Sequence, residues 1–231
     1  MQNTSFVSPR SVAISASTEA QIYGLFALAM GLTLVGIIAG IMFAPALFNS
    51  GVIIFLLIAT LAIVFTSRWW MESYPLNYFL FGAFPLISGI TLTPYLMYIL
   101  ESYVNGAGIL VNAFAATVCM SVAAAVFART TKKSLLGMQG ALLMGLIGLI
   151  LMGVLQLIFP GLRTGVTELM LSGFGVVLFA VFIAFDVQRI TALGRVGANP
   201  FLLALSLYLD VYNMFLYVLR FMLAISGNRR N

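Results

Sequence analysis

Two aspartates, Asp186 and Asp210, lie inside the last two apolar segments of the chain, equally far from the segment that joins them. That joining segment, Gly197-Ala198-Asn199-Pro200, is typical of a turn. In an antiparallel helical hairpin both carboxyl groups would lie at one depth, on the order of 15 Å from the turn at a rise of 1.5 Å per residue. Carboxylates at membrane depth are costly and usually face a partner or a water-filled cavity. The spacing therefore predicts a carboxylate pair that shares protons or a cation.

The last apolar segment also carries a polar stripe, which consists of Ser206, Asp210, Asn213, Tyr217 and Arg220. Their spacing of 4, 3, 4 and 3 residues places all five along one side of a helix. Such a stripe points toward a bundle interior or a solvated path, or it forms a hydrogen-bond network that fastens helices. We favour the path, because a buried carboxylate costs more than the serine or asparagine that would suffice for fastening.

Two arginines are candidates to neutralise the aspartate pair. Arg189 follows Asp186 by three residues, which is also a common spacing for an ordinary ion pair at a helix end. Arg68 ends the second apolar segment on the side of the bundle expected for the pair, although its position also fits snorkelling to the membrane interface.

The third apolar segment contains SGITLTPYLMY, residues 88–98. Pro85 and Pro94 each remove a backbone donor, so the sequence predicts a kinked helix whose free carbonyls line protein or a cavity. Three hydroxyl groups share one face of this helix: Ser88, Thr91 and Tyr95.

The composition indicates an integral membrane protein. Of the 231 residues, 62% are hydrophobic and only 7% are charged, whereas soluble domains carry roughly a quarter charged residues. The net charge of +5 does not indicate nucleic-acid binding, because the basic residues lie in loops between apolar segments, where they set topology. The chain has one cysteine and no histidine, so it can form no internal disulfide, and proton sensing near neutral pH must use carboxyl groups.

Seven segments are long and apolar enough to be candidate membrane spans, with residues 1–21 as a polar tail, 22–226 as one membrane domain and 227–231 as a second tail. The expected spans are 22–48, 51–67, 77–100, 107–128, 135–159, 166–188 and 200–226. The excess of Lys and Arg in alternate loops predicts a cytoplasmic N-terminus, with Arg229 and Arg230 as exceptions on the outer side. Small residues such as Gly36 and Gly40 are expected to let helices pack closely.

Several of these segments resemble the Bax-inhibitor family of membrane proteins, in its bacterial branch. The resemblance covers nearly the whole chain in the same order, and its specific parts are the LYLD segment and the aspartate near the end of the sixth span. The similar stretches are AQIYGLFALAMGLT (20–33), SGITLTP (88–94), TTKKSL (130–135), FDVQRI (185–190) and ALSLYLDVYNMFLYVLRF (204–221).

The resemblance implies an all-α protein with seven transmembrane helices, six of them packed around a central C-terminal seventh. It implies that Asp186 and Asp210 form the family's aspartate dyad, that Arg68 is its latch arginine, and that the protein is a proton-sensitive calcium leak channel in the bacterial inner membrane. Animal relatives are linked to suppression of cell death. Some relatives have an acidic residue within the second helix, and 51–67 has none. Ser134 stands where relatives often have an acidic residue.

The expected ligands are calcium, protons and membrane lipid, with no cofactor. Two carboxylates supply at most four oxygens whereas calcium takes six to eight, so Asp186 and Asp210 would form a weak, transient site. An intramembrane aspartyl protease is the enzymatic alternative, but Leu207-Tyr208-Leu209-Asp210 lacks both glycines of the GxGD motif. A non-conducting regulator of other membrane proteins is compatible with the same residues, and the sequence identifies no protein partner.

Overall fold

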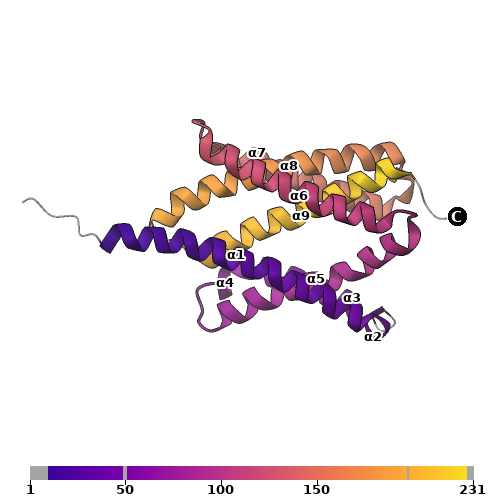
Figure 1. Ribbon diagram of the computed structural model, residues 1–231, viewed down its shortest axis with the longest axis horizontal. Coiled ribbons are helices and arrows are strands. Elements are labelled where there is room, and N and C mark those ends of the chain that lie inside the picture. Colours follow the sequence, from indigo (N-terminus) through magenta and orange to yellow (C-terminus); the bar gives the residue numbers. More distant parts are fainter. Residues whose placement is uncertain (1–9, 49–50, 197, 228–231) are drawn as a thin grey trace, which may run out of the picture.

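The computed structural model describes residues 10–48, 51–196 and 198–227, and this part of the chain is helical without a β-strand (Figure 1). Apart from the first, the long helices begin and end close to the bounds of the apolar segments. The α-helices are α1 (Arg10–Met42), α2 (Ala44–Phe48), α3 (Val52–Phe65), α4 (Ser67–Trp70), α5 (Leu76–Ser102), α6 (Gly106–Thr130), α7 (Gln139–Ile158), α8 (Gly165–Leu193) and α9 (Pro200–Ser226). Short 3-10 turns η1 (Leu136–Met138), η2 (Pro160–Leu162) and η3 (Gly194–Val196) lie between some of them.

Six of the described helices, α1, α5, α6, α7, α8 and α9, are long and apolar enough to cross a membrane. The protein is therefore an integral membrane protein. Helix α1 already begins within the segment 1–21 that was expected to be a polar tail, but its apolar, span-like part starts at Thr18. The expected outer position of Arg229 and Arg230 lies outside the described residues.

The second expected span, 51–67, is shorter in the structure. Helix α3 has 14 residues, which is about 21 Å at 1.5 Å per residue and less than the roughly 30 Å of a bilayer core. It ends at Phe65 with Thr66 as its C-cap, and the Trp70 indole N–H of the short helix α4 donates to the Ile63 carbonyl at 3.0 Å. Of the seven expected spans, the described structure thus shows six full-length helices and one short one.

Helix α9 lies between two groups of helices (Figure 1). On one side α1 and α3 pack against α5, and on the other α6 and α7 pack against α8. Helix α9 itself contacts α1, α5, α6 and α8, and half of its apolar stretch is buried. The resemblance implied six helices around this one; the structure shows these four as its packing partners, with α3 packed mainly on α5 and α7 on α8.

Helices α1 and α5 cross at close range through small residues. A Cβ atom at Gly36 would overlap the Leu86 carbonyl, and one at Gly89 would overlap the Thr33 carbonyl. One turn further along, the Thr93 hydroxyl donates to the Ile37 carbonyl of α1 at 3.3 Å. Close approach through glycine, expected for Gly36, is therefore seen at this crossing.

The glycines of α7 behave differently from those at the α1–α5 crossing. Gly145 packs against Leu178 of α8, but a Cβ atom at Gly140, Gly148 or Gly153 would meet open space. Only part of the glycine pattern on this helix therefore serves helix packing.

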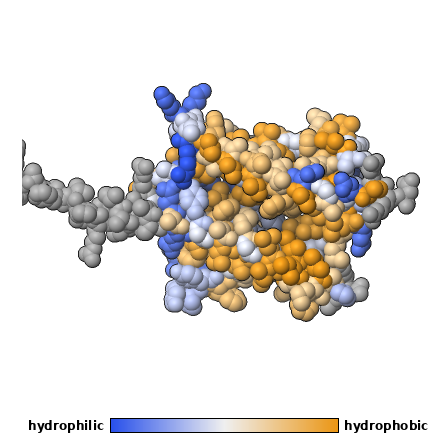
Figure 2. Space-filling model, viewed as in Figure 1, coloured by the Kyte–Doolittle hydropathy of each residue, from blue (hydrophilic) through white to orange (hydrophobic). Residues whose placement is uncertain are grey.

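The outer surface of the helices is apolar, and Figure 2 shows hydrophilic residues gathered toward the end where α1 begins. Large side chains such as Phe79, Met144 and Leu157 are about seven-tenths exposed, which suits contact with lipid. The basic connection between α6 and α7, with Arg129, Lys132 and Lys133, lies at the end of α6 beside the last turns of α8.

Candidate functional site

The dyad is built on the hairpin of α8 and α9, and local sequence signals fix both helix starts. Thr164 caps α8 in a capping box with Thr167. Asn199 caps α9 by accepting from the Phe201 N–H, and Pro200 follows at the first helical position. The Asn199 amide also donates to the Met71 carbonyl at 3.0 Å, which ties the start of α9 to the segment after α4. Of the expected turn, Gly197 lies outside the described residues.

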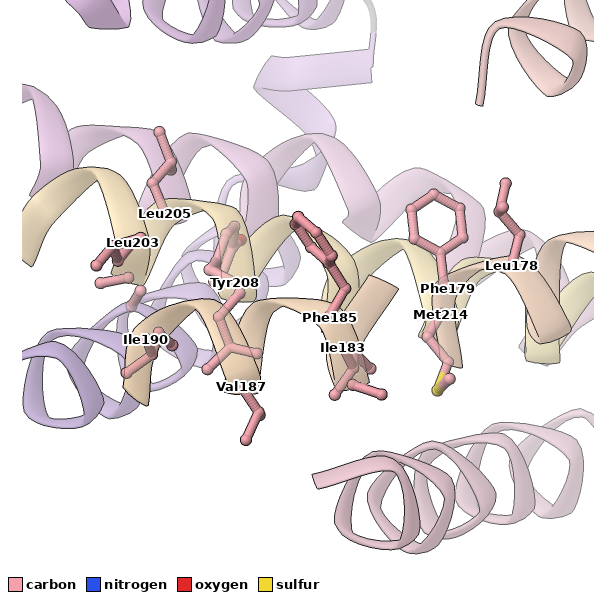
Figure 3. Close-up of a cluster of buried hydrophobic side chains, with 14 of the residues drawn as sticks. Leu178, Phe179, Ile183, Phe185, Val187, Ile190, Leu203, Leu205, Tyr208 and Met214 are labelled. Atoms are coloured by element: carbon pink, nitrogen blue, oxygen red, sulfur yellow. The ribbon is translucent and has the colours of Figure 1, made fainter. Parts of the chain in front are cut away.

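The hairpin brings Asp186 of α8 and Asp210 of α9 together in the protein interior. Only 2% of Asp186 and 6% of Asp210 is exposed, and their carboxyl groups lie within hydrogen-bonding reach of each other. The Ser206 hydroxyl, one turn before Asp210, lies close to the Asp186 carboxyl group. Figure 3 shows α8 and α9 side by side, with Phe185 and Val187, the sequence neighbours of Asp186, among the buried apolar side chains.

Each carboxyl group of the dyad keeps one oxygen without a partner. Asp186 Oδ2 and Asp210 Oδ2 are buried and accept no hydrogen bond within the described part of the chain. Two ionised carboxylates contain no donor, so a hydrogen bond between them requires a shared proton. The arrangement can therefore hold a proton or, when both groups are ionised, a cation.

The cation beside the dyad is Arg189 rather than Arg68. Arg189 Nη1 lies 3.7 Å from Asp186 Oδ1, and its side chain is 28% exposed. Arg68 lies exposed on α4, and within the residues described here it makes no ion pair with either aspartate. In the described structure the ion-pair partner of Asp186 is therefore Arg189, at the ordinary i,i+3 spacing, and not Arg68, which the resemblance implied as the latch.

The other members of the polar stripe are partly buried, and Tyr217 and Arg220 contact α8. The Asn213 amide donates to the Leu209 carbonyl of its own helix at 2.7 Å. The Tyr217 ring packs so tightly on Gly175 of α8 that a Cβ atom there would overlap it. Arg220 ends the stripe in a 2.8 Å ion pair with Glu168 of α8.

Glu168 is therefore a site residue that sequence reasoning missed. Glu168 lies near the start of the expected sixth span, 166–188, where a solvated side chain is common. Its position in the first turn of α8 is opposite the last turns of α9 in an antiparallel hairpin, where Arg220 lies. Equal spacing from the joining segment does not pair these two residues, because Glu168 lies farther from it along the chain than Arg220 does.

A second polar network, also missed, lies on the opposite side of α9. Tyr208 and Tyr212 are four residues apart and so share a face of the helix. The Tyr208 hydroxyl is 2.8 Å from the Thr33 hydroxyl of α1, and the Tyr212 hydroxyl donates to the Ser88 carbonyl of α5 at 3.2 Å.

The hydroxyl groups of Ser88 and Thr91 on α5 belong to this network and not to the expected ion path. The Ser88 hydroxyl donates to the Phe84 carbonyl of its own helix, and the Thr91 hydroxyl donates to the Ser88 carbonyl. Ser88 and Thr91 were candidate path residues, and the structure places them with Tyr212 rather than with the aspartates.

We expect Tyr208→Phe to lower the free energy of unfolding by about 1 kcal/mol, because it removes one buried interhelical hydrogen bond and keeps the ring. Unfolding of the purified protein in mixed micelles would measure this change. In a double-mutant cycle, Thr33→Val should then cost little more in the Tyr208→Phe background; fully additive effects would contradict a Thr33–Tyr208 bond.

Gln188, two residues after Asp186, fixes the connection between α6 and α7. Its side-chain carbonyl accepts from the Leu135 N–H at 2.7 Å, and its amide donates to the Ala128 and Lys133 carbonyls. The turn of α8 that carries Asp186 is thus tied to the basic end of α6. The sequence alone offered no signal for these partners, because all three are backbone groups.

The dyad has few ligands to offer a metal ion. Among the described residues no group of three His, Cys, Asp or Glu side chains could hold one. Two carboxylates and the Ser206 hydroxyl are fewer oxygens than calcium requires, so water would have to complete the coordination of an ion passing here.

Comparison with known proteins identifies the family. The chain matches the family model described as inhibitor of apoptosis-promoting Bax1 over residues 16–228. It is 32% identical to an uncharacterised protein of Campylobacter jejuni over 201 residues, which cover 86% of this chain and 84% of that protein. An uncharacterised Helicobacter pylori protein is 28% identical over 198 residues, or 86% of this chain and 82% of its own length. An uncharacterised Lactococcus lactis protein is 46% identical over 72 residues, about three-tenths of either chain. Because the family model matches nearly the whole chain, this membrane protein belongs to the Bax-inhibitor family.

Proposed function

We propose that the protein is a pH-sensitive leak channel for calcium and other cations, with Asp186 and Asp210 as the site where protons and cations compete. One observation carries the proposal: two buried carboxyl groups on adjacent helices lie within hydrogen-bonding reach, and each keeps an unpartnered oxygen. A purely structural contact between α8 and α9 would be cheaper with serine or asparagine at both positions. Family membership agrees with this proposal.

The cation route would follow the interface of α8 and α9. The partly buried stripe continues from Asp210 through Asn213 and Tyr217 to Arg220. In the present conformation Tyr217 fills the space next to Gly175, so opening requires this ring to move or the two helices to separate. A weak site made of two carboxylates suits an ion that must enter and leave quickly.

We further propose that the protein resides in a bacterial inner membrane with its N-terminus in the cytoplasm. The relatives named above are bacterial. Arg129, Lys132, Lys133 and Arg189 lie at the end of the bundle where α6 and α8 end, and the positive-inside rule assigns that end to the cytoplasm. Labelling of single cysteines introduced at either end, in a background without Cys119, would test this orientation.

Flux of calcium into liposomes that contain the purified protein tests the channel. We expect calcium entry at neutral pH above that of empty liposomes, and a change of its rate as the pH falls. A rate equal to that of empty liposomes across this pH range would contradict the channel and favour the alternative function, a non-conducting regulator of other membrane proteins. Peptide-cleavage assays are expected to show no activity, because the proposal assigns the dyad to ion binding.

Arg189, beside the dyad, and Arg68, on α4, lead to different predictions. Arg189→Gln should move the midpoint of the pH response to higher pH, because removing a positive charge beside a carboxylate favours its protonated form. Arg68→Gln changes the net charge equally but should leave the midpoint in place, because Arg68 makes no ion pair with either aspartate in the described structure. The liposome assay at a series of pH values measures both variants. The opposite pattern, a shift with Arg68→Gln alone, would show that Arg68 is the latch in the conducting protein.

A further inference from the structure

A cavity of about 880 Å³ lies at the end of the bundle opposite the basic α6–α7 connection. Its walls come from the last turns of α5, α7 and α9 and from the first turn of α8. This volume is within the range of small-molecule sites, which occupy about 300–1,000 Å³. The aspartate dyad does not line it.

One polar side chain in this cavity has an unmet hydrogen-bonding need. Gln156 lines the cavity near the end of α7 and is only 2% exposed, and its amide nitrogen Nε2 has no hydrogen-bond partner within the described residues. Leaving a buried donor unpaired costs free energy, and few such groups occur in folded proteins. A ligand atom that accepts a hydrogen bond would satisfy Gln156.

The charges that line the cavity favour an anion. Arg163 and Arg220 both line it, and Glu168 is the one acidic side chain among the described lining residues. The ion pair of Arg220 with Glu168 uses one guanidinium nitrogen, Nη2, whereas a guanidinium group has five N–H donors. Guanidinium and amide donors together match the oxygens of a phosphate or carboxylate group.

Apolar residues complete the walls. Ile150, Val154 and Leu157 of α7 line the cavity, and all three are also exposed on the lipid-facing surface of the bundle. An anionic headgroup with attached acyl chains therefore fits as well as a free small anion does. Both share the same anionic, oxygen-rich group.

We propose that this cavity binds an anionic phosphate or carboxylate group, which accepts a hydrogen bond from Gln156 and lies between Arg163 and Arg220. The site is separate from the dyad, and the proposal holds whether or not the protein conducts ions. It assigns a function to Gln156, which is otherwise an unexplained polar residue on an apolar helix.

Thermal unfolding of the full chain in a neutral detergent would test the proposal with three probes: inorganic phosphate, dioleoylphosphatidylglycerol in mixed micelles, and dioleoylphosphatidylcholine as the uncharged-headgroup comparison. Phosphate or phosphatidylglycerol should raise the midpoint temperature in a saturable way, and phosphatidylcholine should raise it less. Stabilisation by both anionic probes indicates a site for the free anion, and stabilisation by phosphatidylglycerol alone indicates a lipid headgroup.

Two variants locate the binding in this cavity. Gln156→Leu removes the unpaired donor, and Arg163→Gln removes an exposed charge, so each should weaken the apparent affinity by about tenfold or more. Lys132→Gln removes the same charge at the opposite end of the bundle and should leave the affinity unchanged. Equal loss with Lys132→Gln and Arg163→Gln, unchanged affinity in Gln156→Leu, or no saturable stabilisation of the parent protein would each overturn the proposal.

Discussion

Replacing Asp210 with asparagine is expected to remove most of the pH dependence of calcium flux through the protein in liposomes. Asparagine keeps the shape of the side chain but neither binds nor releases a proton in this pH range. The chain has no histidine, so carboxyl groups are the side chains left to respond between neutral and acidic pH. In the proposed dyad Asp210 shares its proton with Asp186, so the replacement Asp186→Asn should have the same effect.

The matched control is Glu72→Gln, which makes the same chemical change at an exposed position after α4. This variant should keep the pH profile of the parent. All variants must first elute as a single species and unfold at similar temperatures, so that lost flux is not lost folding. Asparagine variants that titrate like the parent would identify the dyad as a fastening contact, and the leak channel would then lack its proton site.

Asp186 and Asp210 show how much of the site could be predicted from sequence. Their equal distance from a Gly-Ala-Asn-Pro segment predicted two carboxyl groups at one depth, and the hairpin of α8 and α9 places them within reach of each other. Spacing works here because a helical hairpin converts sequence distance into depth with one fixed rise per residue. Glu168 and Arg220 lie at unequal distances from that segment, so the same spacing does not predict their ion pair.

Arg68 and Gln156 show where sequence reasoning stops. The place of Arg68 was inferred from resemblance, and the short helix α3 followed by the turn at Thr66 sets α4 apart from the dyad. Gln156 is one polar residue in an apolar stretch, and periodicity cannot tell whether such a side chain has a partner. Both depend on how helices distant in sequence pack together, which local patterns do not encode.

The α1–α5 crossing leads to the second large effect. We expect Gly89→Ala to lower the free energy of unfolding by about 3 kcal/mol, which is at the upper end for overpacking. The new Cβ atom would overlap the backbone carbonyl of Thr33, and a backbone carbonyl cannot rotate away as a side chain can. Gly148→Ala is the matched control, because its Cβ atom meets open space on α7. The free energy of unfolding of this variant should differ from that of the parent by no more than about 1 kcal/mol, in the direction of a more stable helix. Denaturant titration in mixed micelles measures both variants.

The shift that Gly89→Ala forces at the α1–α5 crossing should also affect α9, because Thr33 of α1 contacts both α5 and α9. Its carbonyl faces Gly89 of α5, while its hydroxyl bonds to Tyr208 of α9. A shift of α1 away from α5 would lengthen the Thr33–Tyr208 bond, so the coupling between Thr33→Val and Tyr208→Phe should shrink in the Gly89→Ala background. Two results would contradict this prediction: a Gly89→Ala variant as stable as Gly148→Ala, or an unchanged coupling between Thr33→Val and Tyr208→Phe. Either would show that the close α1–α5 crossing does not hold α1 against α9, so that the other contacts between these two helices must position them.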